Sequence, residues 1–402
     1  MPPSQCKSLA SILLLLVVGM AGVTPASEPS TVDRFNYILG TQAIGGKYQF
    51  TRQDPLVESA EVIRAMGASC MKFDLRPKPK QYPGAHSLVE LARDEPSHRK
   101  VLDMPFANFQ LWAEPFANTS WKQGFTKAHA DLEYQEMYAL TVHLLKTYSG
   151  TGKTFYLGHW EGDNLLRGSI NKTYDAQMTP ERVQGMIDWL TTRQRAVDEA
   201  KRDTPHQDVQ VWHYTELNHP TISLREGRPT LVNQVLPHVP VDFVSYSAYD
   251  VTNVPKPEEI KAVLSYIESK LAPKAGIPGK RVFIGEYGYS VFHNGKQHHS
   301  PQEQDRLSRT TIQAALEWGC PFILYWELYN NELEPDGLQR GFWMIDDKGV
   351  KQPIYETQYG KEKIIGCVMV KRQWGGGYVK QDTAMVDVHS SLTYPSPHEI
   401  RK

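Results

Sequence analysis

Two glutamates, Glu161 and Glu286, each follow a short β-prone run, in the sequences FYLGHWEGDN and RVFIGEYG. A pair of carboxyl groups can divide acid–base work, because one donates a proton to a leaving oxygen while the other attacks or activates water. Cleavage of a glycosidic bond needs such a pair on opposite sides of the scissile bond. The two residues lie far apart in the sequence, so the fold must bring them together.

The elements that would position them are short β-rich runs that alternate with amphipathic stretches. Helical patterns are predicted at 131–148, 179–201, 257–271 and 301–318, and in two of them Pro follows a capping Thr or Ser. Strands that alternate with helices predict a parallel sheet with right-handed crossovers. The predicted strands are Phe35–Gly40, Cys70–Leu75, Phe109–Trp112, Thr154–His159, Val209–Tyr214, Asp242–Ala248, Arg281–Tyr287 and Pro321–Leu328.

Eight such units predict an α/β protein with a closed (β/α)8 TIM barrel rather than an open doubly wound sheet. No GxGxxG motif follows the first predicted strand, which argues against a dinucleotide-binding fold. The segment Arg76–Ala130 is rich in Pro, Lys and aromatic residues, with a short helical piece predicted near His86–Arg93. Long loops at the carboxyl ends of barrel strands build substrate sites, so this segment is expected to shape one.

Carboxylates and aromatic residues dominate the predicted strand ends, where the catalytic groups of such barrels lie. Aromatic faces suit the apolar C–H faces of sugar rings, whose hydroxyls need polar partners. Glu161 and Glu286 are the predicted catalytic pair. The residues predicted to bind the substrate are Arg76, Trp112, Trp160, Asn164, His213, Glu216, Tyr246, Tyr249, Trp326 and Glu327.

The two strand-end glutamates and Trp326 resemble the pattern of the clan A glycoside hydrolases, a (β/α)8 group with cellulase-like and β-glycosidase-like families. The resemblance covers roughly Asn36–Asn331 by strand order. It implies that Glu161 is the acid/base, that Glu286 is the nucleophile, and that Trp326 lines the sugar subsite. It also implies net retention through a glycosyl-enzyme intermediate, with no metal or other cofactor.

Further residues are placed by the same resemblance. Tyr246 or Tyr249 matches the tyrosine or histidine near the nucleophile, and Arg76 matches the arginine on the second strand. Trp160 departs from the pattern, because the clan usually has Asn before the acid/base, where it contacts the sugar 2-hydroxyl. Asn164 or another residue at the barrel mouth would supply that contact, or the activity differs from that of ordinary clan members. The Trp160 indole is expected to raise the pKa of Glu161.

Two other functions fit the same residues. In a metal-dependent isomerase or phosphoesterase, a divalent ion could be held by His159, Glu161, His213, Glu216 and Glu286, although no H-x-H motif follows the first strand. A barrel that binds carbohydrate without cleaving it would keep the aromatic residues but not need the carboxylate pair.

Single residues also allow other roles. Glu286 could be a structural carboxylate paired with a basic residue such as Arg76. Glu216 and Glu327 are rivals of Glu161 for the acid/base role.

Charge and composition narrow the choice of partner. The chain has 402 residues and a formal net charge of −1, without a basic run that would indicate binding to nucleic acid or to a membrane surface. The expected partner is an oligo- or polysaccharide. The four cysteines form no CxxC motif, and an odd number remains when Cys6, in the N-terminal leader, is left out. Cys70 and Cys320 are expected to be buried thiols.

The N-terminus has the pattern of a secretory signal peptide. Lys7 precedes an apolar run at 9–23, and Thr24-Pro25-Ala26 supplies small residues for cleavage. The protein is therefore expected to be secreted or periplasmic, without stable membrane insertion after the signal is removed. The predicted division is a signal peptide at 1–26, the barrel domain at 33–365, and a C-terminal extension at 366–402 for which no structure is predicted.

Overall fold

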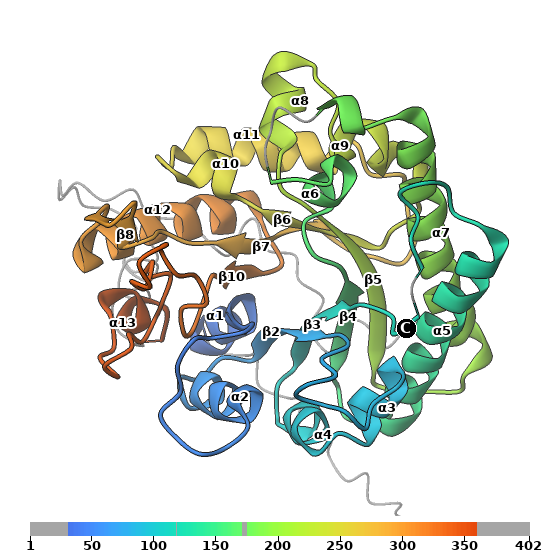
Figure 1. Ribbon diagram of the computed structural model, residues 1–402, viewed down its shortest axis with the longest axis horizontal. Coiled ribbons are helices and arrows are strands. Elements are labelled where there is room, and N and C mark those ends of the chain that lie inside the picture. The colour runs from blue at the N-terminus through green and yellow to red at the C-terminus, as the bar shows by residue number, and fades with distance from the viewer. Residues whose placement is uncertain (1–30, 118, 171–174, 360–402) are drawn as a thin grey trace, which may run out of the picture.

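The computed structural model of the protein describes residues 31–117, 119–170 and 175–359. Eight parallel strands form a closed barrel in the order β1-β10-β7-β6-β5-β4-β3-β2 (Figure 1). Two further short strands, β8 and β9, form a hairpin after β7. The strands are β1 Leu39–Ala43, β2 Cys70–Leu75, β3 Asn108–Ala113, β4 Thr154–Gly158, β5 Gln210–Leu217, β6 Phe243–Ser247, β7 Val282–Tyr287, β8 Phe292–His293, β9 Lys296–Gln297 and β10 Ile323–Tyr325.

Helices surround the barrel, as a (β/α)8 fold requires (Figure 1). The caps expected at Thr179 and Ser300 are present: each side chain accepts a backbone N–H three residues further along, and Pro is the first helical residue. The α-helices are α1 Thr31–Ile38, α2 Pro55–Ala65, α3 Leu88–Arg93, α4 Pro96–Asp103, α5 Lys127–Thr147, α6 Gly162–Arg167, α7 Pro180–Asp203, α8 Pro220–Glu226, α9 Leu231–Gln234, α10 Tyr249–Thr252, α11 Pro257–Glu268, α12 Pro301–Trp318 and α13 Pro353–Tyr359.

The predicted TIM barrel is confirmed, with some boundaries corrected. The first strand begins at Leu39 rather than Phe35, because Thr31–Ile38 is a helix that buries Phe35 and Ile38, one turn apart. The helix Pro96–Asp103 was not predicted. Cys70 and Cys320 are buried free thiols, as expected. The predicted signal peptide and C-terminal extension lie outside the described residues, among which no helix is long and apolar enough to cross a membrane.

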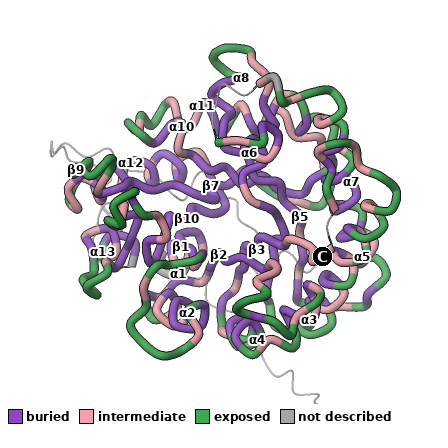
Figure 2. Tube along the Cα trace, viewed as in Figure 1, coloured by how far each residue is buried: buried purple, intermediate pink, exposed green. Residues whose placement is uncertain are grey.

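Side chains that alternate along each strand separate two apolar regions. In β2, Met71, Phe73 and Leu75 belong to the core between strands and helices, whereas Cys70 belongs to a second cluster inside the barrel. Figure 2 shows that the barrel strands are mostly buried. Lys72 has the same strand parity as Cys70, so the pleat directs its side chain into the barrel interior.

Candidate active site

A buried lysine lies at the centre of the carboxylate cluster. The Nζ atom of Lys72 on β2 is 2.9 Å from Glu286 Oε1 and 2.7 Å from Glu216 Oε2. The side chains of Lys72 and Glu216 are completely buried, and that of Glu286 is 3% exposed. A buried ammonium needs carboxylate partners to offset the loss of hydration, and Lys72 has two. Lys72 is not among the residues predicted for the site, although a lone lysine in the otherwise buried strand CMKFDL is a usable signal.

A local irregularity in β7 directs Glu286 toward this lysine. Along β6 and β7, Tyr246 pairs with Ile284, but the next residue of β6, Ser247, pairs with Glu286, so β7 has an extra residue at Gly285. Such a bulge changes the direction of the following side chains. Gly285 is required here, because a Cβ atom at this position would lie 1.8 Å from the Ser245 Oγ.

Glu161 immediately precedes α6 and is 9% exposed. Its Oε2 atom accepts hydrogen bonds from the side-chain amides of Asn164 (2.5 Å) and Asn218 (3.2 Å). Its backbone N–H donates to Glu216 Oε1 at 3.2 Å. Glu216 therefore contacts the Glu161 backbone with one oxygen and Lys72 with the other, which links the two predicted catalytic residues.

Glu216 is fixed by two further donors. Ser245 Oγ donates to its Oε2 at 2.8 Å, and Trp112 Nε1 approaches the same oxygen at 3.4 Å. With Lys72 and the Glu161 N–H, these contacts surround both carboxylate oxygens. These contacts hold Glu216 in position against the Glu161 backbone, so its carboxylate is not free to act as the catalytic acid.

The two predicted catalytic carboxyl groups have different electrostatic surroundings. Burial raises the pKa of Glu161 well above its usual range, and the nearby Glu286 and Glu216 raise it further. Burial also raises the pKa of Glu286, to about 7, even though Lys72 and the Tyr249 hydroxyl, which donates to Glu286 Oε2 at 3.3 Å, both lower it. Lys72 touches Glu286 and not Glu161, so Glu161 retains its proton more readily.

Aromatic residues border the carboxylates. Trp112 on β3 and Trp326 after β10 have ring centroids 6.3 Å apart, and Trp160 packs against the same interior cluster. The Trp326 Nε1 donates to Glu332 Oε1 at 3.2 Å, and Tyr249 reaches Glu286 as described above. The structure therefore brings these four predicted substrate-binding aromatics to the mouth of the barrel beside the glutamates.

Two other predicted binding residues lie outside the barrel interior. His213 contacts Arg193 and Gln194 on α7, and the Tyr246 hydroxyl donates to Asp250. The alternation of side chains along a strand explains this. Glu216 on β5 and Ser245 on β6 face the interior, and His213 and Tyr246 lie an odd number of residues away from them, so they face the helices. Of the two tyrosines considered near Glu286, Tyr249 is the one that contacts it.

Arg76 and Glu327 lie at the barrel mouth with partners of their own. Arg76 Nε is 2.7 Å from Asp74, and a second guanidinium nitrogen is 3.7 Å from Glu114. The cation paired with Glu286 is therefore Lys72 and not Arg76. Glu327 Oε2 accepts the backbone N–H of Ile44 at 3.3 Å, and burial raises the pKa of Glu327.

The two histidines of the alternative metal site do not join the three glutamates. His159 Nε2 is 2.8 Å from Thr215 Oγ1 and its Nδ1 is 2.9 Å from the Trp160 carbonyl oxygen, while His213 faces α7. Within the described part of the chain, no group of three or more His, Cys, Asp or Glu side chains is arranged to hold a metal ion.

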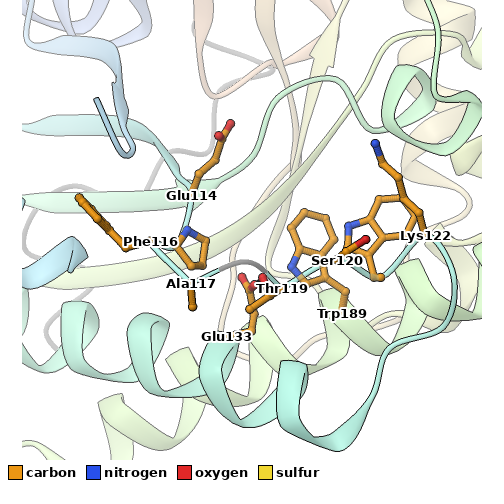
Figure 3. A pocket seen from close by; sticks show the side chains of 10 residues that line it. Glu114, Phe116, Ala117, Thr119, Ser120, Lys122, Glu133 and Trp189 are labelled. Atoms are coloured by element: carbon orange, nitrogen blue, oxygen red, sulfur yellow. Dashed lines mark hydrogen bonds between the residues drawn. The ribbon is translucent and has the colours of Figure 1, made fainter. Parts of the chain in front are cut away.

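A cavity of about 430 Å³ lies beyond the end of β3, against α5 and α7 (Figure 3). Trp121 and Trp189, whose rings stack at 5.6 Å, form part of its wall, and Glu133 lies below. Glu114 connects the cavity to the barrel mouth, because it also contacts Arg76. The lining residues are Glu114, Pro115, Phe116, Ala117, Thr119, Ser120, Trp121, Lys122, Glu133 and Trp189.

No family model and no curated protein sequence matches the chain. Among solved structures, a GH5_18 variant from Streptomyces cattleya in complex with Manβ1-4GlcNAc is similar, with 12% identity and a TM-score of 0.53 over 81% of this chain and 80% of that chain. An exo-β-1,4-mannosidase from Opitutaceae bacterium strain TAV5 has 13% identity and a TM-score of 0.52 over 82% of this chain and 59% of that one. A GH5_18 protein from Bifidobacterium longum subsp. infantis has 13% identity and a TM-score of 0.52, over 82% and 79%.

These neighbours share the (β/α)8 barrel with this chain at low sequence identity. The expected resemblance to clan A glycoside hydrolases is therefore confirmed in the fold. The roles of individual residues stay predictions that rest on the geometry of the site.

Proposed function

We propose that the protein is a secreted or periplasmic glycoside hydrolase that cleaves O-glycosidic bonds of an oligo- or polysaccharide by a retaining, double-displacement mechanism. One observation carries the proposal: two buried carboxyl groups lie at the barrel mouth, and the buried Lys72 contacts Glu286 but not Glu161. This difference suits an ionised nucleophile and a protonated acid. The fold shared with glycoside hydrolases supports the same reaction class.

In the first step, the Glu286 carboxylate attacks the anomeric carbon while Glu161 donates its proton to the glycosidic oxygen. The bond between that oxygen and the anomeric carbon breaks, the leaving group departs as an alcohol, and an ester joins the sugar to Glu286. Lys72 holds Glu286 ionised before attack. Since Lys72 also contacts Glu216, it keeps one carboxylate partner when Glu286 becomes a neutral ester.

In the second step, the Glu161 carboxylate removes a proton from water, and the water oxygen attacks the anomeric carbon. The ester bond breaks and the Glu286 carboxylate is regenerated, so the two inversions give net retention. Proton NMR of the first product formed would test this directly. Initial release of the anomer with the substrate's configuration is expected, and initial release of the opposite anomer would rule out the double displacement.

The substrate class is proposed from the aromatic residues at the barrel mouth and from the neighbour bound to Manβ1-4GlcNAc. A hydrolysis screen should therefore include Manβ1-4GlcNAc, β-mannan oligosaccharides, other β-linked polysaccharides and aryl β-glycosides. Cleavage of at least one substrate is expected. Binding to the same sugars without any cleavage would favour the alternative of a non-catalytic carbohydrate-binding barrel.

Replacing Glu161 by glutamine is expected to slow cleavage according to the leaving group. A positioned general acid contributes about 10²–10⁴-fold, and a good leaving group such as 2,4-dinitrophenolate needs no proton. The value of kcat/KM should therefore fall by about 10²-fold or more for a phenyl glycoside and by far less for the 2,4-dinitrophenyl glycoside of the same sugar. Equal losses on both substrates would contradict the acid role of Glu161.

Removal of divalent metal tests the other enzymatic alternative. Because the histidines of that alternative face Thr215 and α7, we expect activity to survive dialysis against EDTA. Elemental analysis of the purified protein is the accompanying measurement. A tightly bound stoichiometric metal, lost together with activity, would overturn the metal-free mechanism.

A further inference from the structure

A glutamic acid has two oxygens, but a general acid must present its proton on the one that faces the leaving group. In Glu161 the oxygens differ, because Oε2 receives both the Asn164 amide at 2.5 Å and the Asn218 amide at 3.2 Å. Both asparagines are nearly buried, with 6% and 4% of their surfaces exposed. Their contacts with Glu161 are therefore little weakened by competing water.

His219 contacts the side chains of both asparagines. Its Nε2 atom lies 3.2 Å from Asn164 Oδ1 and 3.2 Å from the Asn218 amide nitrogen, so it donates to Asn164 in one tautomer and accepts from Asn218 in the other. In either case the Asn164 amide nitrogen donates to Glu161. The backbone N–H groups of Asn218 and His219 both donate to Asp163 Oδ2, at 3.0 and 3.2 Å, which ties the end of β5 to α6.

These contacts determine which oxygen carries the proton. An NH2 group only donates hydrogen bonds, so a proton on Oε2 would point at two donors. In the neutral acid, Oε2 is therefore the carbonyl oxygen, and Oε1 carries the hydrogen. In the carboxylate, the same two amides again stabilise Oε2.

From this geometry we propose that Asn164 and Asn218 are positioning residues that hold Glu161 so that Oε1 alone donates the proton to the leaving oxygen and later takes one from water. The inference rests on the proposed glycoside hydrolase function. It also assigns Asn164 a role other than the contact with the sugar 2-hydroxyl considered from the sequence. One N–H group of Asn164 is already used by Glu161, and the Asn164 oxygen lies 3.2 Å from His219 Nε2.

The experiment compares N164A and N218A with the wild type on the 2,4-dinitrophenyl and phenyl glycosides of one sugar that the wild type cleaves. Because kcat/KM covers the steps through formation of the ester, it reports the proton donation of the first step. Misdirecting the acid should lower kcat/KM on the phenyl glycoside by about tenfold or more and on the dinitrophenyl glycoside by less than about threefold. Both variants are predicted to show this pattern, with a larger effect for N164A, whose contact is shorter.

Asn108→Ala is the matched control, because Asn108 is completely buried at the opposite end of the barrel, where β3 begins. It should affect both substrates equally, and thermal unfolding should show that the variants are folded. Equal losses on both substrates in N164A and N218A, or no loss on either, would overturn the inference. The proposed function itself fails separately, if Glu161→Gln lacks the dependence on the leaving group.

Discussion

Glu286→Gln should abolish turnover, with kcat lower by at least about 10³-fold on every substrate that the wild type cleaves. Glutamine preserves the volume and an oxygen for Lys72 Nζ, but it cannot form the glycosyl ester. Unlike the Glu161 variant, this one should be equally inactive on dinitrophenyl and phenyl glycosides. Steady-state assays with both substrates, and mass spectrometry of the protein after exposure to a slow substrate, are the measurements.

One result would contradict this prediction, and the stability of the variant shows whether it is folded. Residual activity above one hundredth of wild type on the dinitrophenyl glycoside would assign the nucleophile to another residue, such as Glu216, the other carboxylate in contact with Lys72. The Glu286→Gln variant should remain folded. Burial raises the pKa of Glu286 to about 7 from the ordinary 4.5, so in the wild type the folded state binds this proton more tightly than the unfolded chain. Ionising Glu286 therefore costs stability as the pH rises from about 4.5 to about 7.

Glutamine does not ionise, so it removes this pH-dependent cost. Above pH 7 the melting temperature of the variant should lie at or above that of the wild type, provided that the amide oxygen remains on Lys72. Thermal unfolding at pH 5 and pH 8 measures this difference, and a variant less stable than the wild type only at pH 8 would contradict it.

The fold was predictable because strands and helices alternate with clear start signals. Cys70–Leu75 and Pro301–Trp318 were predicted with the bounds that the structure gives. The sequence also marks Glu286, since a carboxylate at the end of a buried strand of a parallel barrel lies at the catalytic mouth. The predicted start of the first strand was wrong because the spacing of the apolar residues Phe35 and Ile38 fits a short helix as well as a strand.

The interior of the site was less predictable, for geometric reasons. Whether His213 or Glu216 faces the barrel depends on the parity of the strand, and a shift of one residue exchanges the two faces. The extra residue at Gly285 changes the direction of Glu286 and leaves no pattern that a sequence period reveals. The Asn218 contact with Glu161 depends on how the end of β5 meets α6, a tertiary relation between residues far apart in the chain.

The ionisation states of the site follow from its charge balance. Glu161, Glu216 and Glu286 lie together in a buried region, and Lys72 is the cation in contact with two of them. Three carboxylates with one ammonium would leave uncompensated buried charge, so at least one proton is retained at neutral pH. The position of Lys72 decides that Glu161 holds the proton.

Lys72→Met should therefore shift the acidic limb of the profile of kcat/KM against pH to higher pH. Lys72 lowers the pKa of Glu286, so without it Glu286 keeps its proton to higher pH and the ionised nucleophile forms only under more alkaline conditions. Activity near pH 6 should fall more than activity near pH 8. An acidic limb at the wild-type position would show that Lys72 does not set the ionisation of the nucleophile.

Stability provides the second readout of the same substitution. Losing one partner of a buried ion pair costs about 3–5 kcal/mol, because Glu216 and Glu286 are left without their cation. Protonation removes that unpaired charge, so the deficit of Lys72→Met in chemical denaturation should be larger at pH 8 than at pH 5. Lys153→Met is the matched control: Lys153, just before β4, is also buried, but its Nζ donates to the backbone carbonyl oxygens of Met104 and Phe106, before β3 begins and away from the glutamates. Lys153→Met should leave the acidic limb unchanged. A shift as large as that of Lys72→Met would mean that the shift comes from a general destabilisation of the barrel.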